Sequence, residues 1–333
     1  MGRKHTRRHR VGTGLIVAGV IALLAVSGCG TDSGSTGDDA DLVAAVANFD
    51  VVTNRPDRFI VGILSADRSR TLAFGGVTLD FAYLGNGEEA DQTEGLEFGP
   101  VEASFLPIPG QDLTAEATQG PPQMVVGSLM TGVYAAPEVS FEQAGFWQVT
   151  VTVDVEGGTE TATGAFQVLT SSDLPAVGQP ALQTRQPLAG DPGVDPKAID
   201  SRAGKDIPVP DPELHDITVA DAIETGRPVM IVVSTPTFCV SRFCGPITDS
   251  VQDLASRYGD RMEFIHLEVW QDYAANKVNP AAAEWIAPTP ETDGREPWVF
   301  VIDHNGIIVQ RFDNVASDAE LEEAVENVLT TGS

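Results

Sequence analysis

The hydrophobic pattern of this chain changes type near residue 170, and this change most limits the folds open to it. Before it, apolar and polar residues alternate in short runs broken by Gly, Pro and Asn, as in antiparallel strands with one buried face. After it, fully apolar runs of strand length are separated by segments with helical periodicity, as in a sheet covered by helices. The 333 residues therefore predict two domains of different class.

The first half predicts an all-β domain over residues 42–170. In the run 147–155, every second residue from Val149 to Val155 is valine, so one face of this strand is apolar. The predicted architecture that closes such strands is a β-sandwich. The runs that predict strands are 58–64, 77–84, 101–106, 124–130, 147–155 and 161–169.

Two short motifs in this half resemble those of a known group of domains. Gly132-Val133-Tyr134 is followed by Ala144-Gly145-Phe146-Trp147-Gln148-Val149. They resemble the Gly-x-Tyr and Gly-x-Trp-x-Val endings of immunoglobulin-like domains in bacterial envelope proteins, among them the YtkA-like group. The resemblance implies an immunoglobulin-like sandwich with Tyr134 and Trp147 in its core, and it implies no catalytic residue.

Residues 171–213 are rich in Pro, Gly and Asp. Repeated proline keeps a chain extended and semi-rigid, so this segment is predicted to be a linker. The second domain is predicted over residues 214–333.

Two of the three cysteines, Cys239 and Cys244, lie at a predicted strand-to-helix junction. The apolar run 228–233 predicts a strand buried on both faces, and the helical spacing that follows ends at Gly259. A second strand at 262–269 completes a β-α-β unit. Backbone N–H groups and the helix dipole favour a thiolate at this junction. Residues five apart on one helix face about 140° apart, so Cys239 must lie in the loop if the two sulfurs are to bond.

The remainder of this half predicts a β-β-α unit. It consists of a strand at 298–302, a turn at 303–306, a strand at 307–312 and a helix opened by the capping box Ser317-Asp318-Ala319-Glu320. The whole order, with Val232-Val233-Ser234-Thr235-Pro236-Thr237-Phe238-Cys239 and Glu296-Pro297-Trp298-Val299-Phe300-Val301-Ile302-Asp303, resembles a thioredoxin-like α/β domain. The resemblance implies that Phe238 precedes a nucleophilic Cys239 and that a cis-proline, Pro297, faces it and shapes the substrate groove.

Two positions depart from the thioredoxin pattern. The usual Cys-Gly-Pro-Cys site is replaced, because Cys244-Gly245-Pro246 is followed by Ile247. Cys239 fits the register counted from the strand, so it is the first choice of nucleophile with Cys244 resolving, and the opposite assignment stays open. The buried acid that the family carries on its central strand is missing, because Val233 occupies that place.

Three alternatives to thiol–disulfide exchange remain. An atypical peroxiredoxin also uses a four-residue spacing between cysteines, but Pro236 and Pro297 stand where its threonine and arginine are expected. A Sco-type copper chaperone pairs two cysteines with a distant histidine, here His266 or His304. Three residues separate the cysteines of that family, whereas four separate Cys239 from Cys244. In the third, the fold is a binding module with the disulfide as a permanent brace. We expect no metal and no cofactor.

The N-terminus resembles a bacterial lipoprotein signal. A basic stretch containing Arg3 and Arg10 precedes a short apolar run, and Val26-Ser27-Gly28-Cys29 closes it. The resemblance implies a signal peptide over residues 1–28, lipid attachment at Cys29 with a palmitate-type acyl chain, and a location on the extracytoplasmic face of the cell membrane. Residues 29–41 are small and polar and predict a flexible tether.

Charge limits the partners that this chain can have. Without the signal segment, 15 Lys and Arg face 48 Asp and Glu, a net charge near −33. Such a field repels phosphate polyanions, so nucleic acid is excluded as a partner. The expected partners are protein thiols or disulfides in the cell envelope, where an oxidising compartment allows a disulfide to persist.

Overall fold

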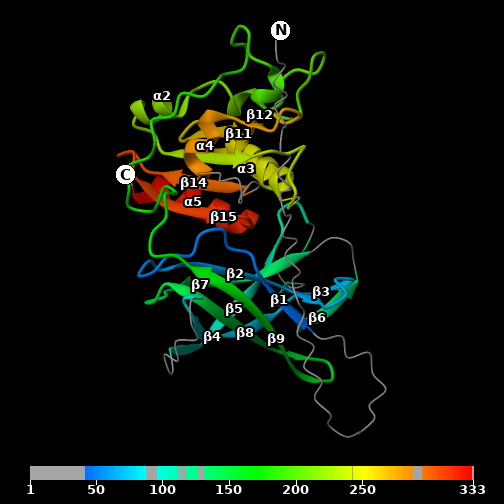
Figure 1. Ribbon diagram of the computed structural model, residues 1–333. Coiled ribbons are helices and arrows are strands. Elements are labelled where there is room, and N and C mark those ends of the chain that lie inside the picture. The colour runs from blue at the N-terminus through cyan, green and yellow to red at the C-terminus, as the bar shows by residue number, and fades with distance from the viewer. Residues whose placement is uncertain are drawn as a thin grey trace, which may run out of the picture. The chain divides into compact units, whose positions relative to one another are not determined.

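The computed structural model describes residues 42–87, 96–111, 113, 118–126, 131–241, 243–287 and 295–331 (Figure 1). The predicted signal peptide, the tether and the lipid-attachment residue Cys29 lie outside these ranges. The described residues from Leu42 onward fall into one compact unit that contains two large sheets. Among them, no helix is both long and apolar enough to cross a membrane.

The first sheet has nine strands in the order β1-β9-β8-β4-β5-β7-β2-β3-β6 (Figure 1). Strand β1 runs parallel to β9, and the other neighbours pair antiparallel. The strands are β1 (Leu42–Val46), β2 (Asp57–Ser65), β3 (Arg70–Ala73), β4 (Gly76–Gly85), β5 (Glu97–Pro107), β6 (Gln123–Val126), β7 (Gly132–Val139), β8 (Gly145–Val155) and β9 (Gly158–Val168).

This sheet closes on itself, whereas the sequence predicted two sheets packed face to face. Strand β1 pairs with β2 on one side, where Leu42 faces Ser65, and with β9 on the other, where Leu42 faces Ala162. Strand β1 therefore closes a ring that runs from β9 through β8, β4, β5 and β7 to β2, while β3 and β6 continue from β2 outside this ring. Closure covers the edges that β9 and β2 would otherwise leave open. The antiparallel β class is confirmed. The immunoglobulin-like sandwich is not.

The core of the first sheet follows the predicted alternation. Val149, Val151 and Val153 of β8 are buried, while Val155 at the strand end is half-buried. Tyr134 and Trp147 are core residues, exposed by 0% and 2%. Aromatic rings fill much of the interior, and Phe59 meets Phe81 edge to face at 5.0 Å.

The second sheet has the order β11-β10-β14-β15, with β10 parallel to β11 and the other pairs antiparallel. The predicted order of β-α-β followed by β-β-α is confirmed. The larger elements are β10 (Val229–Ser234), α3 (Cys244–Tyr258), β11 (Glu263–Glu268), β14 (Trp298–Ile302), β15 (Ile308–Asp313) and α5 (Asp318–Thr331). The smaller ones are η1 (Pro196–Ala198), η2 (Pro212–Leu214), α2 (Val219–Glu224), β12 (Trp270–Asp272), β13 (Lys277–Val278) and α4 (Pro280–Ile286).

Helices cover both faces of this sheet. Successive residues of β10 point to opposite sides, so Ile231 joins an apolar cluster with α2 and α4, and Val232 joins one with α3 and α5. All six residues of β10 are buried. Burial on both faces explains why the run is continuously apolar and not alternating.

The segment predicted as a linker is extended but packs against the second sheet. Leu174 and Ala181 belong to the apolar cluster of that sheet, and both are 5% exposed. The Ala181 N–H donates to the Gly306 carbonyl at 2.8 Å. Proline content sets the backbone conformation of such a segment, but it does not determine what the segment contacts. We call residues 171–215 the strap.

Two arginines connect the first sheet to the second. Arg58 of β2 binds Glu320 at 2.9 Å. Arg311 of β15 lies 2.8 Å from Asp50 and 2.9 Å from Asp57, and its side chain is 3% exposed. These contacts hold β15 and the start of α5 against β2.

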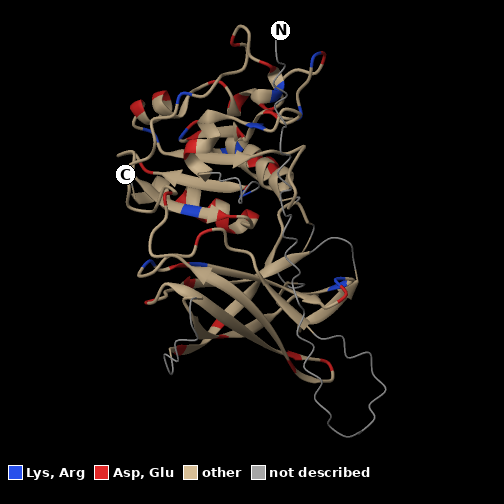
Figure 2. Cartoon of the chain, in the orientation of Figure 1, with Lys and Arg blue, Asp and Glu red and all other residues tan. Residues whose placement is uncertain are grey.

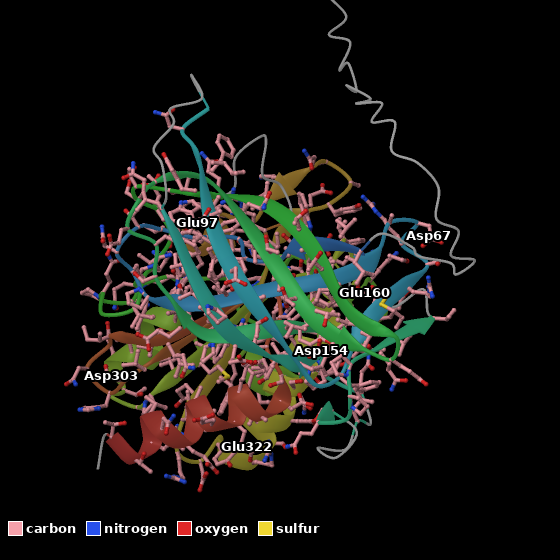
Figure 3. The ribbon with its side chains drawn as sticks, turned by 90° about the horizontal axis from the view of Figure 1, so that it is seen from below. Asp67, Glu97, Asp154, Glu160, Asp303 and Glu322 are labelled. Atoms are coloured by element: carbon pink, nitrogen blue, oxygen red, sulfur yellow. A yellow bond between two sulfur atoms is a disulfide. The ribbon has the colours of Figure 1, made fainter. Side chains whose placement is uncertain are left out.

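Acidic residues occur in both halves, in agreement with the strongly negative net charge (Figure 2). In Figure 3, Asp154 and Glu160 belong to the β8–β9 hairpin, Asp303 to the β14–β15 turn and Glu322 to α5. The Asp303 carboxylate accepts hydrogen bonds from the N–H groups of Asn305 and Ile307, both at 2.9 Å. This geometry confirms the turn predicted there.

Candidate active site

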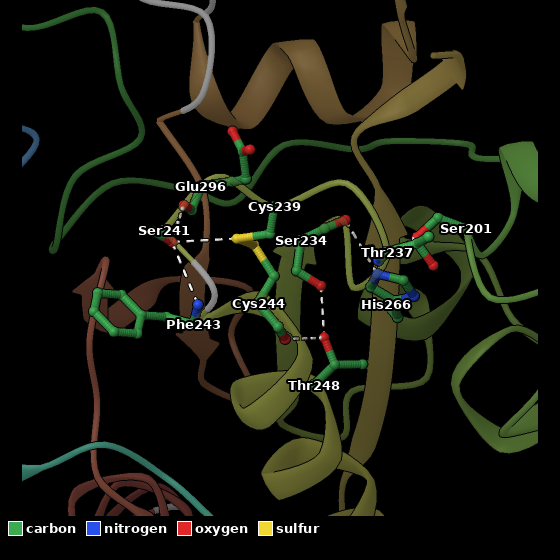
Figure 4. The surroundings of a disulfide bond; sticks show 10 residues. All are labelled: Ser201, Ser234, Thr237, Cys239, Ser241, Phe243, Cys244, Thr248, His266 and Glu296. Atoms are coloured by element: carbon green, nitrogen blue, oxygen red, sulfur yellow. Dashed lines mark hydrogen bonds between the residues drawn. A yellow bond between two sulfur atoms is a disulfide. The ribbon is translucent and has the colours of Figure 1, made fainter. Parts of the chain in front are cut away.

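Cys239 and Cys244 form a disulfide with their Cα atoms 6.0 Å apart (Figure 4). Cys239 lies in the loop after β10, as the helix geometry required, and Cys244 is the first residue of α3. Their exposure differs: Cys239 is half-buried and Cys244 is 0% exposed. An incoming thiolate therefore has access to one sulfur and not to the other.

The helix start fixes the position of Cys244. Its carbonyl accepts a hydrogen bond from the Thr248 hydroxyl at 2.7 Å, and that hydroxyl lies 2.6 Å from the Ser234 hydroxyl on β10 (Figure 4). The residue before the helix, Phe243, caps it with no side-chain hydrogen bond. The first N–H groups of α3 and the helix dipole thus favour a thiolate at Cys244 more directly than at Cys239.

Ser241 contacts the more accessible sulfur, that of Cys239, and no sequence pattern predicted this contact. Its hydroxyl lies 3.2 Å from the Cys239 sulfur and 3.5 Å from the Glu296 carbonyl oxygen. The Phe243 N–H donates to the same hydroxyl at 3.4 Å. A hydroxyl in this position can donate a hydrogen bond to a thiolate at Cys239 and so stabilise it.

Glu296 brings a buried carboxyl group to both sulfurs. A carboxylate oxygen of this residue lies within 4.8 Å of the sulfur of Cys239 and of that of Cys244, and the side chain belongs to a residue 3% exposed. The sequence lacks the usual acid on β10, where the fully buried Val233 takes its place. The position of Glu296 near the sulfurs was not predicted, because it depends on how the loop before β14 packs against the cysteine loop.

Pro297 is buried at the start of β14, and the Glu296–Pro297 peptide bond is cis. The carbonyl of that bond is the one that faces Ser241. The structure therefore brings Cys239, Cys244 and the segment at Pro297 together. It keeps His304 apart from them, in the exposed β14–β15 turn, and it groups His266 with Asp200 and His215.

A cavity of about 950 Å³ lies beside the cysteine loop. Phe238, the residue before Cys239 in the sequence, lines this cavity. Its ring stacks on that of Tyr273, with the centroids 4.0 Å apart and an angle of 3° between the ring planes. Trp270 meets Tyr273 edge to face at 5.3 Å. Lys197 and Lys277 also line the cavity. The cavity beside the cysteine loop thus has an aromatic wall, and its lining carries cations together with the carboxylates of Asp195 and Asp272.

No family model and no curated protein matches the sequence. Among solved structures, the chain is similar to a thiol:disulfide interchange protein, a thioredoxin family protein from Chlorobium tepidum TLS. The two are 15% identical, with a TM-score of 0.28, over 46% of this chain and 99% of that one. The strand order of the second sheet and the cysteine loop between β10 and α3 agree with the thioredoxin-like arrangement that the sequence predicted.

Proposed function

We propose that this protein exchanges thiols and disulfides through Cys239 and Cys244. The observation that carries the proposal is the unequal exposure of two bonded sulfurs at the junction of a central strand and a helix. A disulfide that closes so short a loop adds about 2 kcal/mol of stability in the loop-entropy estimate, little for a domain with an extensive core. Redox chemistry accounts for the pair better than bracing does.

In the reducing direction, the Cys239 thiolate attacks one sulfur of a partner disulfide. An S–S bond forms to the partner, and the partner's other sulfur leaves as a thiolate that takes a proton from water. Cys244 then attacks the Cys239 sulfur, which restores the internal disulfide and releases the second partner thiolate. Two electrons pass to the partner, and the reverse sequence oxidises a partner dithiol.

Proton transfer at Cys244 is assigned to Glu296. Cys244 is fully buried, so its thiol needs a nearby acceptor before it can attack as a thiolate. The Glu296 carboxyl is buried and within 4.8 Å. It takes the part that the resemblance to thioredoxins gives to an acid on the central strand.

The exchange partner is proposed to be a protein of the cell envelope that docks over the cavity at Phe238 and the segment at Pro297. The aromatic rings of this cavity offer apolar contact to a partner. Lys197 and Lys277 in its lining offer cations to acidic groups on that partner, alongside the carboxylates of Asp195 and Asp272. The immunoglobulin-like relationship of the first half also remains a proposal, supported by the core positions of Tyr134 and Trp147.

The trapping experiment uses two matched variants. Cys244→Ser leaves Cys239 able to attack but unable to finish, so mixed disulfides with envelope proteins should accumulate on non-reducing gels. Cys239→Ser should abolish them. If instead Cys239→Ser accumulates them, Cys244 is the nucleophile. If neither variant accumulates mixed disulfides, and the reduction potential of the wild-type disulfide lies below about −300 mV, the pair is a structural brace.

We further propose that the mature chain is held at the membrane by lipid on Cys29. The basic, apolar and small-residue order before this cysteine supports the proposal. Intact-mass analysis of the membrane fraction should show a chain that begins at an acylated Cys29. A Cys29→Ala protein that is still processed and still bound to membranes would contradict it.

A further inference from the structure

A second group of ionisable side chains lies behind the cysteine loop. Asp200 follows η1 in the strap, His215 follows η2, and His266 belongs to β11. All three residues are buried, with exposures of 0%, 2% and 1%. One carboxylate oxygen, Asp200 Oδ2, lies 3.5 Å from His215 Nε2 and 3.3 Å from His266 Nδ1.

The hydrogen bonds of His266 determine which of its nitrogens carries a proton. Nε2 lies 3.2 Å from the Ser234 carbonyl oxygen, which can only accept, so Nε2 is the donor. In a neutral ring, Nδ1 then presents a lone pair to the Asp200 carboxylate. Two lone pairs held 3.3 Å apart in a buried place repel each other unless a cation lies between them, and that cation is either a proton or a metal ion.

The distances suit a metal ion. Zinc binds imidazole nitrogen and carboxylate oxygen at about 2.0–2.2 Å in a tetrahedral arrangement, which sets ligand atoms roughly 3.3–3.5 Å apart. The two measured separations fall in this range, and the three ligand atoms all lie within 4.8 Å of one another. The bond from His266 to the Ser234 carbonyl is the outer contact that commonly orients a ligating histidine.

The carboxylates around this cluster outnumber the cations that pair with them, so the charge balance favours binding of another cation. Arg202 binds both oxygens of Asp200, with Nε 3.0 Å from Oδ1 and Nη2 2.7 Å from Oδ2. It is shared with Asp211 at 2.7 Å and Asp249 at 3.3 Å. One guanidinium thus serves three carboxylates. Glu268, 1% exposed, adds a further carboxyl nearby through the Ser201 N–H at 2.7 Å.

We propose that Asp200, His215 and His266 bind one divalent transition metal ion, with Zn²⁺ the best fit. The site joins the strap to β11. It also supports the cysteine loop from behind, because Ser234 precedes that loop and the Thr237 N–H within it donates to the Ser201 hydroxyl at 3.1 Å (Figure 4). This metal site is independent of the exchange chemistry and differs from a copper site built on the two cysteines.

The test uses the full chain without a histidine tag, treated with chelator and kept oxidised so that the cysteines bind no metal. Titration with Zn²⁺ should show one equivalent bound and a rise in Tm, because an ion that binds the folded state stabilises it. Co²⁺ as a probe should give visible d–d bands without the intense charge-transfer band of a thiolate ligand.

Variants locate the site. His215→Gln and His266→Gln should each weaken Zn²⁺ binding by at least about tenfold, and His304→Gln, in an exposed turn, should leave it unchanged. The Cys239→Ser/Cys244→Ser chain should still bind, which separates this proposal from the exchange function. If the wild-type chain binds no Zn²⁺ or Co²⁺, a proton holds the cluster together and the proposal fails. It fails equally if both glutamine variants bind normally or if removal of the cysteines abolishes binding. Should a glutamine variant not fold, the wild-type stoichiometry and Co²⁺ spectrum decide.

Discussion

Among single residues, the two cysteines differ in solvent exposure and in the groups that lie near their sulfurs. The half-buried Cys239 has the Ser241 hydroxyl at 3.2 Å, and the buried Cys244 has the start of α3 and the Glu296 carboxyl. The Ser241 hydroxyl can stabilise a thiolate at Cys239, and the helix start can stabilise one at Cys244. Glu296 is proposed to act differently, as the acceptor of the Cys244 proton. The helix start also makes Cys244 a good leaving group when an external thiolate opens the disulfide at Cys239.

The role of Glu296 is tested by Glu296→Gln. An amide cannot accept the Cys244 proton, so the step that releases the partner should slow by at least about tenfold, and its dependence on pH should move toward that of an unassisted thiol. Single-turnover release from a preformed mixed disulfide measures it. Glu97→Gln, on an exposed position of β5, is the matched control. An unchanged rate and pH profile in Glu296→Gln would remove this residue from the mechanism.

At the scale of elements, α5 shows a reciprocal cap that the sequence predicted. The Ser317 hydroxyl accepts from the Glu320 N–H at 3.2 Å, and the Glu320 carboxylate accepts from the Ser317 N–H at 2.9 Å. The same carboxyl binds Arg58 of β2. The helix start is thereby both a local cap and a contact between α5 and the first sheet.

Loss of this cap should be measurable. Ser317→Ala removes one acceptor for the first turn of α5 and should lower the free energy of unfolding by about 1 kcal/mol. Denaturant unfolding at constant m-value checks it. Thr330→Ala, near the exposed far end of the same helix, should change the free energy by less than about 0.5 kcal/mol. Equal losses in the two variants would show that the capping box contributes nothing of its own.

At the scale of the whole molecule, Arg311 links the two sheets from a buried position between Asp50 and Asp57. Burial by itself would raise the pKa of Asp50. Arg311 and Arg55 outweigh burial and hold that pKa below its ordinary value of 3.8. A carboxyl whose folded pKa is lowered contributes stability above its ordinary pKa and loses that contribution as the pH falls toward the folded value.

Asp50→Asn should therefore lower the free energy of unfolding at pH 7, and this loss should be smaller at acidic pH. The expected loss at pH 7 is roughly 1–3 kcal/mol, below that of an orphaned buried charge, because Asp57 still pairs with Arg311. The difference from wild type should shrink as the pH falls below about 4. Unfolding curves from pH 7 to pH 3 measure this, with Asp154→Asn on the exposed β8–β9 hairpin as control. A difference that stays constant with pH would mean that the charge of Asp50 is not involved.

Local sequence patterns were sufficient to predict several helices and strands of this protein. Apolar runs and helical spacing located β10, α3, β14 and α5, and the five-residue spacing placed Cys239 in a loop. These features depend on the order of neighbouring residues, because strand and helix periods and helix caps are local properties.

Contacts between segments far apart in the sequence were not predictable from such local patterns. The closure of the first sheet depends on β1 pairing with the distant β9 as well as with the next strand, β2. The strap packs on a sheet that its composition does not specify. Glu296 reaches the cysteines, and Asp200 reaches His266, across more than fifty residues of sequence. Such contacts form when packing of the core brings together side chains that are not regularly spaced in the sequence. No local sequence pattern therefore predicts them.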